Sequence, residues 1–417
     1  MSKREPRTVQ LVIAAAVAAS VFAAAPVAKA TVYYVSPHGW DSNRGTSPRA
    51  AWRTVGRVNR AAFRPGDTVL FRGGSVYGGT LFPRTSGYAG APITFSSYGR
   101  RRANIRGGIT LVSKDWLVLD RLRVATRRWR TAGDTHGVMS HNRGPGSTNI
   151  VVRDCAFVNV RFGLVLTNHG DRNWTVSGNV IRRTRDSGIV IFGTGQPTNV
   201  GGDHLLFEAN RVIDTGLDTS IRYPKHGVYD VGTNTTFVGN VIRRWSRDRV
   251  YPGAGLSIRA HSTTIRDNWI AGGPYGIAWT GYDSVRGTTQ ISGNRIWGVS
   301  TAGIALTWQT GLIPTRESFV VAGNRILTRA APGSPRPDAI FLQRTLGTVS
   351  IFGNVVGGEH RYCLWVEGLP VAGFAESHNR WNGNHGAERW NWVGVPFARL
   401  VAYQLASGQG AGDSVGP

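Results

Sequence analysis

The sequence predicts an all-β fold, a right-handed parallel β-helix solenoid with a short N-terminal capping helix. Two observations support this prediction. Asparagines recur every 26 to 31 residues, which is the quasi-period of a solenoid. Short stretches on both sides of each asparagine, such as "VSGNVI" and "GIVIF", alternate apolar and polar residues as β-strands do. The recurring positions are Asn179, Asn210, Asn240, Asn268, Asn294, Asn324 and Asn354.

Residues 1–30 are predicted to form a secretory signal peptide. A basic start precedes the apolar run "VQLVIAAAVAASVFAAAPVA", and Ala28, Lys29 and Ala30 offer a cleavage site of mostly small residues. An integral membrane anchor is the alternative, but the run contains Pro26 and no second apolar stretch follows it. The mature chain is therefore expected to be secreted, extracellular and without a membrane anchor.

The rest of the chain divides into three predicted parts. Residues 31–120 supply an N-terminal cap and the first coils, 121–380 the coils of the β-helix, and 381–417 a C-terminal cap and tail. In the first part, "SPRAAWRTVGRVNRAAF" predicts the capping helix, with Ser47 as its N-cap. Three tryptophans are expected to cover the last coil, namely Trp381, Trp390 and Trp392.

The asparagines are predicted to be structural. Equivalent residues of stacked coils lie about 4.8 Å apart, so their amides form a ladder and bond one another and the buried backbone. Cys155 takes the asparagine position of an earlier coil, and Cys363 lies beyond Asn354. Because a disulfide needs neighbouring α-carbons, both cysteines are expected to be free and buried.

The chain is strongly basic, with a formal charge of +25, and arginine supplies 45 of its 49 basic residues. Removing the predicted signal peptide leaves +22. Such a charge attracts polyanions; an arginine-rich surface with no ligand is the alternative. Export disfavours nucleic acid, so the expected partner is an acidic polysaccharide, and the protein is expected to be a monomer.

The opening "YYVSPHGWDSNRGTSPRAAWRTVGRVN", the following "FRPGDTVLFRGG" and the asparagine ladder resemble secreted right-handed parallel β-helix proteins of the pectate-lyase-like superfamily. The resemblance covers nearly all of residues 31–417. It implies the fold and carbohydrate chemistry, because the superfamily includes lyases, glycoside hydrolases, epimerases and proteins without known catalysis. Its calcium-dependent lyases hold the metal with acidic clusters. The aspartates here match no such cluster, so no cofactor is expected, with calcium as the alternative.

The coil that contains "RYPKHGVYD" departs most from its neighbours. Strand alternation predicts Lys225 and Tyr229 side by side on the outer surface. β-Elimination on a polyuronate needs a base, a cation for the carboxylate and a proton donor. The hypothesis assigns Lys225 as base, Arg222 and Arg259 as cations, and Tyr229 or His261 as donor. Alternatively, Lys225 forms a surface ion pair with Asp186 in the preceding coil.

Further residues are predicted to bind substrate around this group. Asp186 and His226 lie next to it, and alternation points Asp230 inward, where neighbouring coils have isoleucine. Tyr282 and Arg286 are expected to line the next subsites.

Two other functions stay open. A glycoside hydrolase would need two carboxylates, available among Asp186, Asp203, Asp230 and Asp283. A non-catalytic carbohydrate-binding protein would use tryptophans such as Trp279, Trp308 and Trp365 as stacking platforms. Zinc, nucleotide-binding and serine-hydrolase motifs are absent from the sequence.

Overall fold

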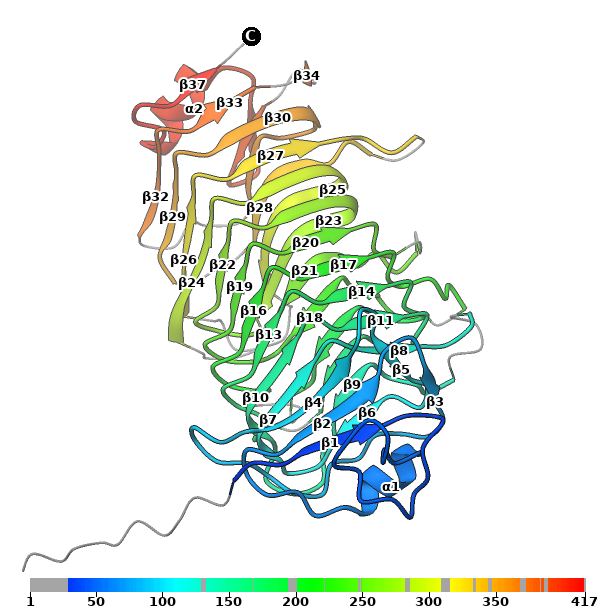
Figure 1. The fold of residues 1–417 in the computed structure, drawn as a ribbon. Helices are drawn as coiled ribbons and strands as arrows, with labels where there is room; N and C mark the ends of the chain where they lie inside the picture. Colours follow the sequence, from blue (N-terminus) through cyan, green and yellow to red (C-terminus); the bar gives the residue numbers. More distant parts are fainter. Residues whose placement is uncertain are drawn as a thin grey trace, which may run out of the picture.

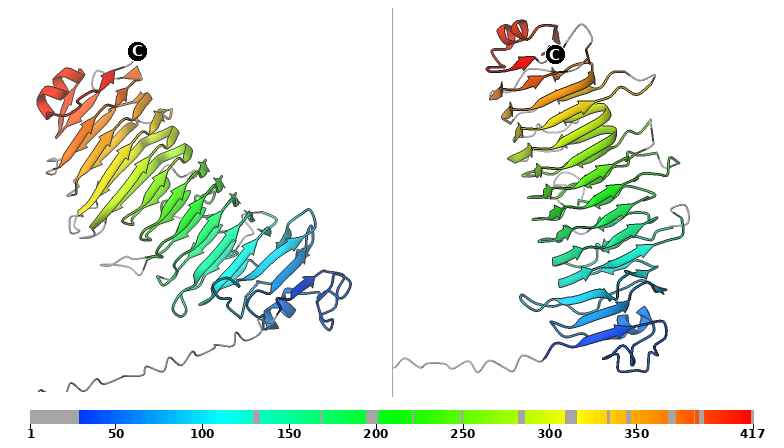
Figure 2. Two further views of the ribbon diagram at one scale, coloured as in Figure 1. Left: turned by 60° about the vertical axis from the view of Figure 1, so that its left-hand side comes forward. Right: turned by 45° about the horizontal axis from the view of Figure 1, so that its top comes forward.

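The computed structural model confirms the parallel β-helix. It describes residues 29–128, 133–167, 169–193, 201–220, 222–246, 248, 250–281, 286–308, 316–332, 335–343, 347–367, 373–382, 384–385 and 389–415. The coils stack into one elongated body that runs from a capped N-terminal end to a capped C-terminal end (Figures 1 and 2). Residues 1–28, most of the predicted signal peptide, lie outside this description.

The strands of successive coils build three faces. Face one is a 13-stranded parallel sheet. Its strands are β1 (Val32–Val35), β2 (Thr68–Arg72), β4 (Ile93–Tyr98), β7 (Asp115–Asp120), β10 (Thr148–Arg153), β13 (Thr175–Ser177), β16 (Leu206–Glu208), β19 (Thr236–Val238), β22 (Thr264–Arg266), β24 (Arg286–Ser292), β26 (Arg316–Ala322), β29 (Val349–Phe352) and β32 (Phe374–Ser377).

Face two follows face one in each coil, directly after the asparagine position. It contains β3 (Val76–Tyr77), β5 (Ala103–Ile105), β8 (Leu122–Ala125), β11 (Ala156–Val158), β14 (Val180–Arg182), β17 (Arg211–Ile213), β20 (Val241–Arg243), the first parts of β23 (Trp269–Gly281) and β25 (Arg295–Trp308), then β27 (Arg325–Thr328), β30 (Val355–His360), β33 (Arg380–Trp381) and β37 (Ser414–Val415).

Face three completes each coil. It contains β6 (Ile109–Leu111), β9 (Val138–Ser140), β12 (Leu164–Leu166), β15 (Ile189–Ile191), β18 (Val228–Asp230), β21 (Ala254–Ile258), the second parts of β23 and β25, then β28 (Asp338–Gln343), β31 (Leu364–Glu367) and β35 (Trp390–Trp392). Two short strands lie at the C-terminal end, namely β34 (Asn384–His385), which pairs with β30, and β36 (Val395–Phe397), which is antiparallel to β35.

The asparagine ladder is confirmed. Each side-chain amide from Asn179 to Asn354 donates to the Oδ1 of the next asparagine at 2.9 to 3.1 Å. Asn379 extends the ladder by one step beyond the predicted set. The backbone N–H of Cys155 donates to Asn179 at 2.9 Å. Both cysteines are free and buried, as predicted.

The N-terminal cap contains the helix α1 (Val55–Arg60), which is shorter than predicted. Thr54 is the N-cap, so the predicted cap at Ser47 is wrong. The reason is that Trp52 forms a β-bridge with Val35, which keeps the chain before Thr54 extended. The helix therefore starts only after this bridge.

The C-terminal end is covered by helix α2 (Leu400–Ser407). Its Tyr403 is fully buried, stacks on Trp390 with ring centroids 5.9 Å apart and meets Trp392 edge-on. Trp381 is also buried and donates to Asp413 at 2.6 Å. The three tryptophans therefore gather at this end, but they belong to the last strands, β33 and β35, and α2 lies against Trp390 and Trp392. Neither helix in the described part of the chain has the length or apolar character that a membrane crossing requires.

The replacement Asn268→Ala tests the ladder. It should lower the free energy of unfolding by roughly 3 kcal/mol, because buried donors and acceptors lose their partners. One such group is the Asn240 amide, which donates to Asn268 at 2.9 Å. Another is the Phe237 carbonyl, which accepts from the Asn268 amide at 3.0 Å. Urea denaturation followed by circular dichroism measures the change. The exposed Asn142→Ala is the matched control, and equal losses in both variants would contradict a structural ladder.

Candidate active site

A cleft of about 430 Å³ opens on the outer side of face three, over strands β12 to β21. Four adjacent coils supply its walls, and a loop that precedes β18 lies over one side. The cleft is lined by Phe162, Asp186, Ser187, Val190, Phe192, Tyr223, Pro224, His226, Tyr229 and Arg259. Four sequence-predicted site residues are therefore brought together here, namely Asp186, His226, Tyr229 and Arg259.

The floor of the cleft is apolar. Phe162, Val165 and Val190 form a small hydrophobic cluster outside the main core, and Tyr229 packs against it. Tyr229 lies next to Val190, which is its partner in register on the strand of the preceding coil. Phe192 lies at the rim, with its ring 6.4 Å from that of Tyr229. Such a floor suits the C–H faces of sugar rings.

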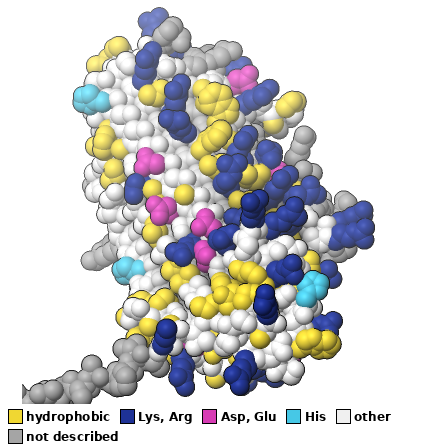
Figure 3. Space-filling view, viewed as in Figure 1, with side chains coloured by type: hydrophobic (Ala, Val, Ile, Leu, Met, Phe, Trp, Pro, Cys, Tyr) yellow, Lys and Arg dark blue, Asp and Glu magenta, His cyan; other side chains and the backbone are white. Residues whose placement is uncertain are grey.

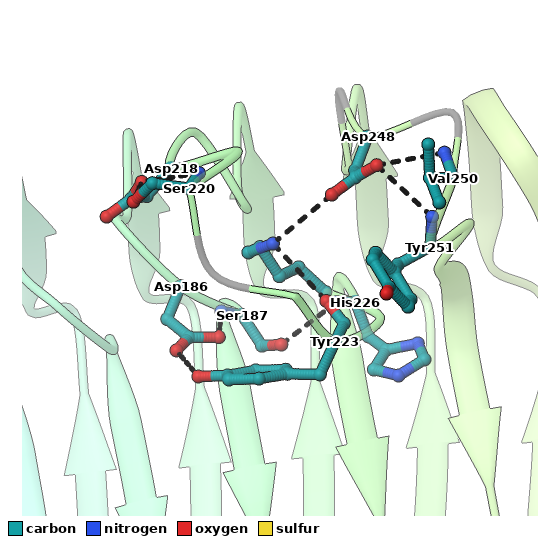
Figure 4. A network of polar contacts seen from close by, with 10 residues as sticks. Asp186, Ser187, Asp218, Ser220, Tyr223, His226, Asp248, Val250 and Tyr251 are labelled. Carbon is teal, nitrogen blue, oxygen red and sulfur yellow. Dashed lines mark hydrogen bonds and ion pairs between the residues drawn. The ribbon is translucent and has the colours of Figure 1, made fainter.

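Asp186 and Tyr223 form the polar pair at one side of the cleft. The Tyr223 hydroxyl donates to Asp186 Oδ2, and the backbone N–H of Ser187 donates to Oδ1 at 2.8 Å. Figure 4 shows the phenol of Tyr223 pointing to this carboxylate. Burial, followed by the hydrogen bond to Asp186 and then the Asp186 charge, raises the pKa of Tyr223 to about 12, and the Arg161 guanidinium opposes this shift. Tyr223 is therefore a protonated phenol at neutral pH.

His226 is held as a neutral imidazole. Its Nδ1 accepts the backbone N–H of Ala254 at 3.0 Å, so the proton of the neutral ring is assigned to Nε2. Burial, followed by the charge of Arg259, lowers the pKa of His226 to about 3. Because Nδ1 is occupied and Nε2 carries the proton, His226 can donate a hydrogen bond to a ligand but cannot serve as a base at neutral pH.

Arg259 supplies the positive charge of the cleft. Its guanidinium lies over the Tyr229 ring, 5.6 Å from the centroid. The backbone N–H of Arg259 donates to the Asp230 carbonyl at 2.7 Å, which fixes the residue at the end of β21. A guanidinium in this position offers paired N–H donors to a carboxylate.

The predicted position of Lys225 on the outer surface is wrong, because its side chain is completely buried. The Nζ atom donates to the Tyr223 carbonyl at 3.2 Å and lies 3.8 Å from Asp248. The loop before β18 covers it: Gly216 packs so closely that a β-carbon there would lie 2.8 Å from the lysine Cβ. The alternative pair of Lys225 with Asp186 is also wrong, since Asp186 binds Tyr223 and Ser187. Lys225 is therefore buried beneath the loop and is not part of the cleft lining.

The other predicted residues lie outside the cleft lining. Asp230 points inward and is fully buried, as predicted, between Ile191 and Ile258 in register. Arg222 is exposed. His261 forms a bridge with Thr233 at the start of the next turn, and burial lowers its pKa.

Two of the predicted residues cannot be placed. Tyr282 lies outside the described residues, as does Asp283, and for Arg286 only the backbone, at the start of β24, is described. For Trp308, too, only the backbone is described. Trp279 is buried and donates to the Ala260 carbonyl at 2.8 Å.

Sequence reasoning gave no site role to six lining residues, namely Phe162, Ser187, Val190, Phe192, Tyr223 and Pro224. A usable signal was present for two of them, because the residue directly before the glycine of each coil faces the same groove. Phe162 and Ser187 occupy that position, as does His226. Phe192 follows β15 and carried no such signal.

Carboxylates are scarce in the cleft. Among the described residues that line it, Asp186 is the single acidic one. Asp203 lies at the turn before face one, where it accepts from Thr233 at 2.7 Å and Asn234 at 2.9 Å. Within the described ranges, no group of three or more histidine, cysteine or acidic side chains is arranged to hold a metal ion.

Comparisons with known proteins agree with the fold. No protein-family model matches the chain. A stretch of 143 residues, 33% of this chain, is 32% identical to a lacto-N-biosidase of Bifidobacterium longum subsp. longum, of which it spans only 8%. The chain is also similar to a solved GH136 lacto-N-biosidase from Eubacterium ramulus, with a TM-score of 0.56 and 14% identity over 78% of this chain and 67% of that one.

A second solved structure is equally similar. The A-module of a mannuronan C-5 epimerase from Azotobacter vinelandii has a TM-score of 0.56 and 13% identity, over 84% of this chain and 91% of that one. At such identities the likeness shows the fold. The expected resemblance to parallel β-helix proteins is therefore confirmed at the level of architecture.

The replacement Asp230→Asn tests the buried carboxylate. Burial raises the pKa of Asp230 to about 7, from 3.8, so its protonated form stabilises the fold at low pH. This stability is fully present below pH 3.8 and is lost as the pH rises through about 7. The variant should therefore melt several degrees higher than the wild type at pH 8 and about equally at pH 4.5. Thermal unfolding at both pH values measures this; a lower Tm of the variant at pH 8 would contradict it.

The replacement Lys225→Met tests whether Lys225 holds the loop. The Tm should fall by about 2–4 °C, because the Tyr223 carbonyl and Asp248 lose their buried cation. In a double-mutant cycle with Asp248→Asn, the combined change should be smaller than the sum of the single changes. Strict additivity would show that the two side chains do not interact.

Proposed function

We propose that the cleft binds a uronate-containing polysaccharide and cleaves it by β-elimination, as a polysaccharide lyase. One observation carries the proposal: a guanidinium, a neutral imidazole and two phenols meet over an apolar floor with a single carboxylate in the described lining. Such a donor-rich, carboxylate-poor cleft fits an anionic sugar. The carbohydrate-binding β-helix architecture of the two similar solved structures supports the substrate class.

Recognition of the uronate carboxylate falls to Arg259 and His226. The guanidinium neutralises the negative charge, and the Nε2–H of the imidazole donates a further hydrogen bond. Neutralisation makes the proton on the neighbouring carbon easier to remove, because the negative charge that develops on the carboxylate oxygens is stabilised. Arg259 therefore takes the place that calcium would occupy in the alternative, metal-dependent mechanism.

Proton transfer falls to the Tyr223–Asp186 pair. The phenol oxygen of Tyr223 accepts the proton of the carbon α to the carboxylate, while its own proton passes along the existing hydrogen bond to Asp186. The C–H electron pair forms the new C=C bond, and the bond from the β carbon to the glycosidic oxygen breaks. Tyr229 protonates the departing oxygen, and exchange with solvent returns the proton from Asp186 to Tyr229.

Glycoside hydrolysis is the second candidate, favoured by the 32% identity to a lacto-N-biosidase over 143 residues. This mechanism requires a second carboxylate near the cleaved bond. Asp186 would be one of the pair. Of the other carboxylates named from the sequence, Asp230 is fully buried and Asp203 lies at the turn before face one.

Measuring the ultraviolet absorbance of the unsaturated uronate on pectate, alginate and glycosaminoglycans tests the proposal. Arg259→Gln and Tyr223→Phe should each lower kcat/KM by about 10²- to 10⁴-fold. Arg266→Gln is the matched control, because Arg266 is exposed on face one and paired with Asp267 at 3.1 Å. Lys225→Met should keep most of the activity.

Other outcomes decide between the candidates. Release of reducing sugar from a neutral polysaccharide without an absorbance rise would support hydrolysis. Loss of the absorbance rise with a chelator would show that calcium neutralises the carboxylate. A loss of about 10³-fold in Lys225→Met, measured well below the Tm of the variant, would restore the lysine as base. No activity on either substrate class would leave the carbohydrate-binding function.

A further inference from the structure

A second hollow lies on face two, away from the cleft. It measures about 1120 Å³ and is lined by seven arginines from β-strands 5 to 14 and their flanking turns. Arg100–Arg102 precede β5, Arg121 and Arg123 come from β8 and the turn before it, and Arg182 and Arg183 end β14. The described lining also contains glycine, serine, alanine, valine and asparagine, and no acidic residue. We call this hollow the arginine groove.

The charge of the arginine groove is poorly neutralised by the protein itself. Arg102 donates to the Asp154 backbone carbonyl at 2.6 Å, and Arg121 to the Gly99 carbonyl at 3.0 Å, so both bind neutral oxygens. Arg182 lies 3.9 Å from Asp214, a carboxylate that Arg244 holds more closely at 2.6 Å. Guanidiniums gathered in this way repel one another and attract anions.

The basic surface continues up the same face. Arg211 and Arg243 stand on β17 and β20, and the Arg243 guanidinium lies 5.0 Å from the centre of the Trp269 ring. Another hollow of about 690 Å³ follows, and its lining includes Trp269, Trp297, Arg295 and Arg325. The one acidic residue of its described lining, Asp267, is paired with Arg266 at 3.1 Å. Figure 3 shows lysine and arginine side chains gathered along this part of the surface.

The two hollows lie on the same face, with Arg211 of β17 between them, and we call this stretch of the surface the track. The track runs from β5 to β27, which is eight strand spacings or roughly 38 Å. A monosaccharide or a single phosphate would occupy a small part of it. Repeated charges along a chain, in contrast, would match repeated guanidiniums along the coils.

We propose that this track binds a chain of anionic polysaccharide lengthwise. Arginine forks fit carboxylate or sulfate groups. Trp269 and Trp297 are 45% and 55% exposed, an arrangement that suits stacking on sugar rings. Single-stranded nucleic acid needs aromatic platforms along its whole path, and the described lining of the arginine groove contains none. The track lies on a different face from the cleft, so the proposal holds whether or not the cleft is catalytic.

The binding of fluorescently labelled polygalacturonate, alginate and chondroitin sulfate to the full chain tests this proposal. The triple variant Arg100→Ser/Arg101→Ser/Arg123→Ser should bind at least one of them about tenfold more weakly than wild type at low salt. The slope of log affinity against log salt should fall by up to about three. The control Arg44→Ser/Arg49→Ser/Arg64→Ser removes the same charge from exposed positions near the N-terminal cap and should bind within about twofold of wild type.

Additional variants and ligands in the same binding experiment decide what the track binds. Trp297→Ala should weaken polysaccharide binding without a change in net charge. Equal losses in the two triple variants would overturn the proposal, because net charge alone would then explain binding. Binding to none of the three polymers, or stronger binding to oligo-dT than to all of them, would also overturn it. Cleavage of an unlabelled trisaccharide, too short to reach the track, should be unchanged in the groove triple, so a failed cleft mechanism remains distinguishable.

Discussion

The parallel pairing of each coil with the next is the constraint on which the whole structure depends. Every inward residue meets the equivalent residue of the coils before and after it, so a column must be apolar or must satisfy its own hydrogen bonds. Isoleucine, valine and leucine fill most columns, and the asparagine ladder is the self-satisfying exception. Asp230 breaks this rule between Ile191 and Ile258, directly behind the cleft. The local rule is thus broken next to the candidate active site.

The cleft exists because one coil carries a longer loop than its neighbours. The loop before β18 brings Tyr223 to Asp186 of the preceding coil and buries Lys225 beneath it. Asp218 secures the loop from the other side, where it accepts from Arg185 at 2.8 Å. Repeated coils supply a uniform surface, and the longer loop converts part of it into a cleft.

The repeat made much of the fold predictable from sequence. Columns of equivalent residues follow from spacing alone, which is why the ladder, the free cysteines and the inward position of Asp230 were predicted correctly. Positions that depend on a loop were not predictable in this way. Lys225 is buried because a segment without periodicity folds over it, and α1 starts late because Trp52 pairs with Val35. The alternation of apolar and polar residues predicts which side of a strand a residue faces. It does not predict whether a loop from elsewhere in the coil buries that residue.

The asparagine ladder also gives the molecule an electrical direction. One N–H of each amide donates to the next asparagine and the other to a backbone carbonyl of the preceding coil, while each Oδ1 after the first accepts from the N-terminal side. The C=O groups therefore point the same way, and their small dipoles add along the axis as peptide dipoles do in a helix. The positive end of this row meets acidic residues: Asn379 donates to Glu376 at 2.9 Å and, through its backbone, to Asp413 at 2.7 Å. The C-terminal cap therefore closes the stack electrostatically as well as sterically, and a chain truncated before Asp413 would leave the row without its counter-charge.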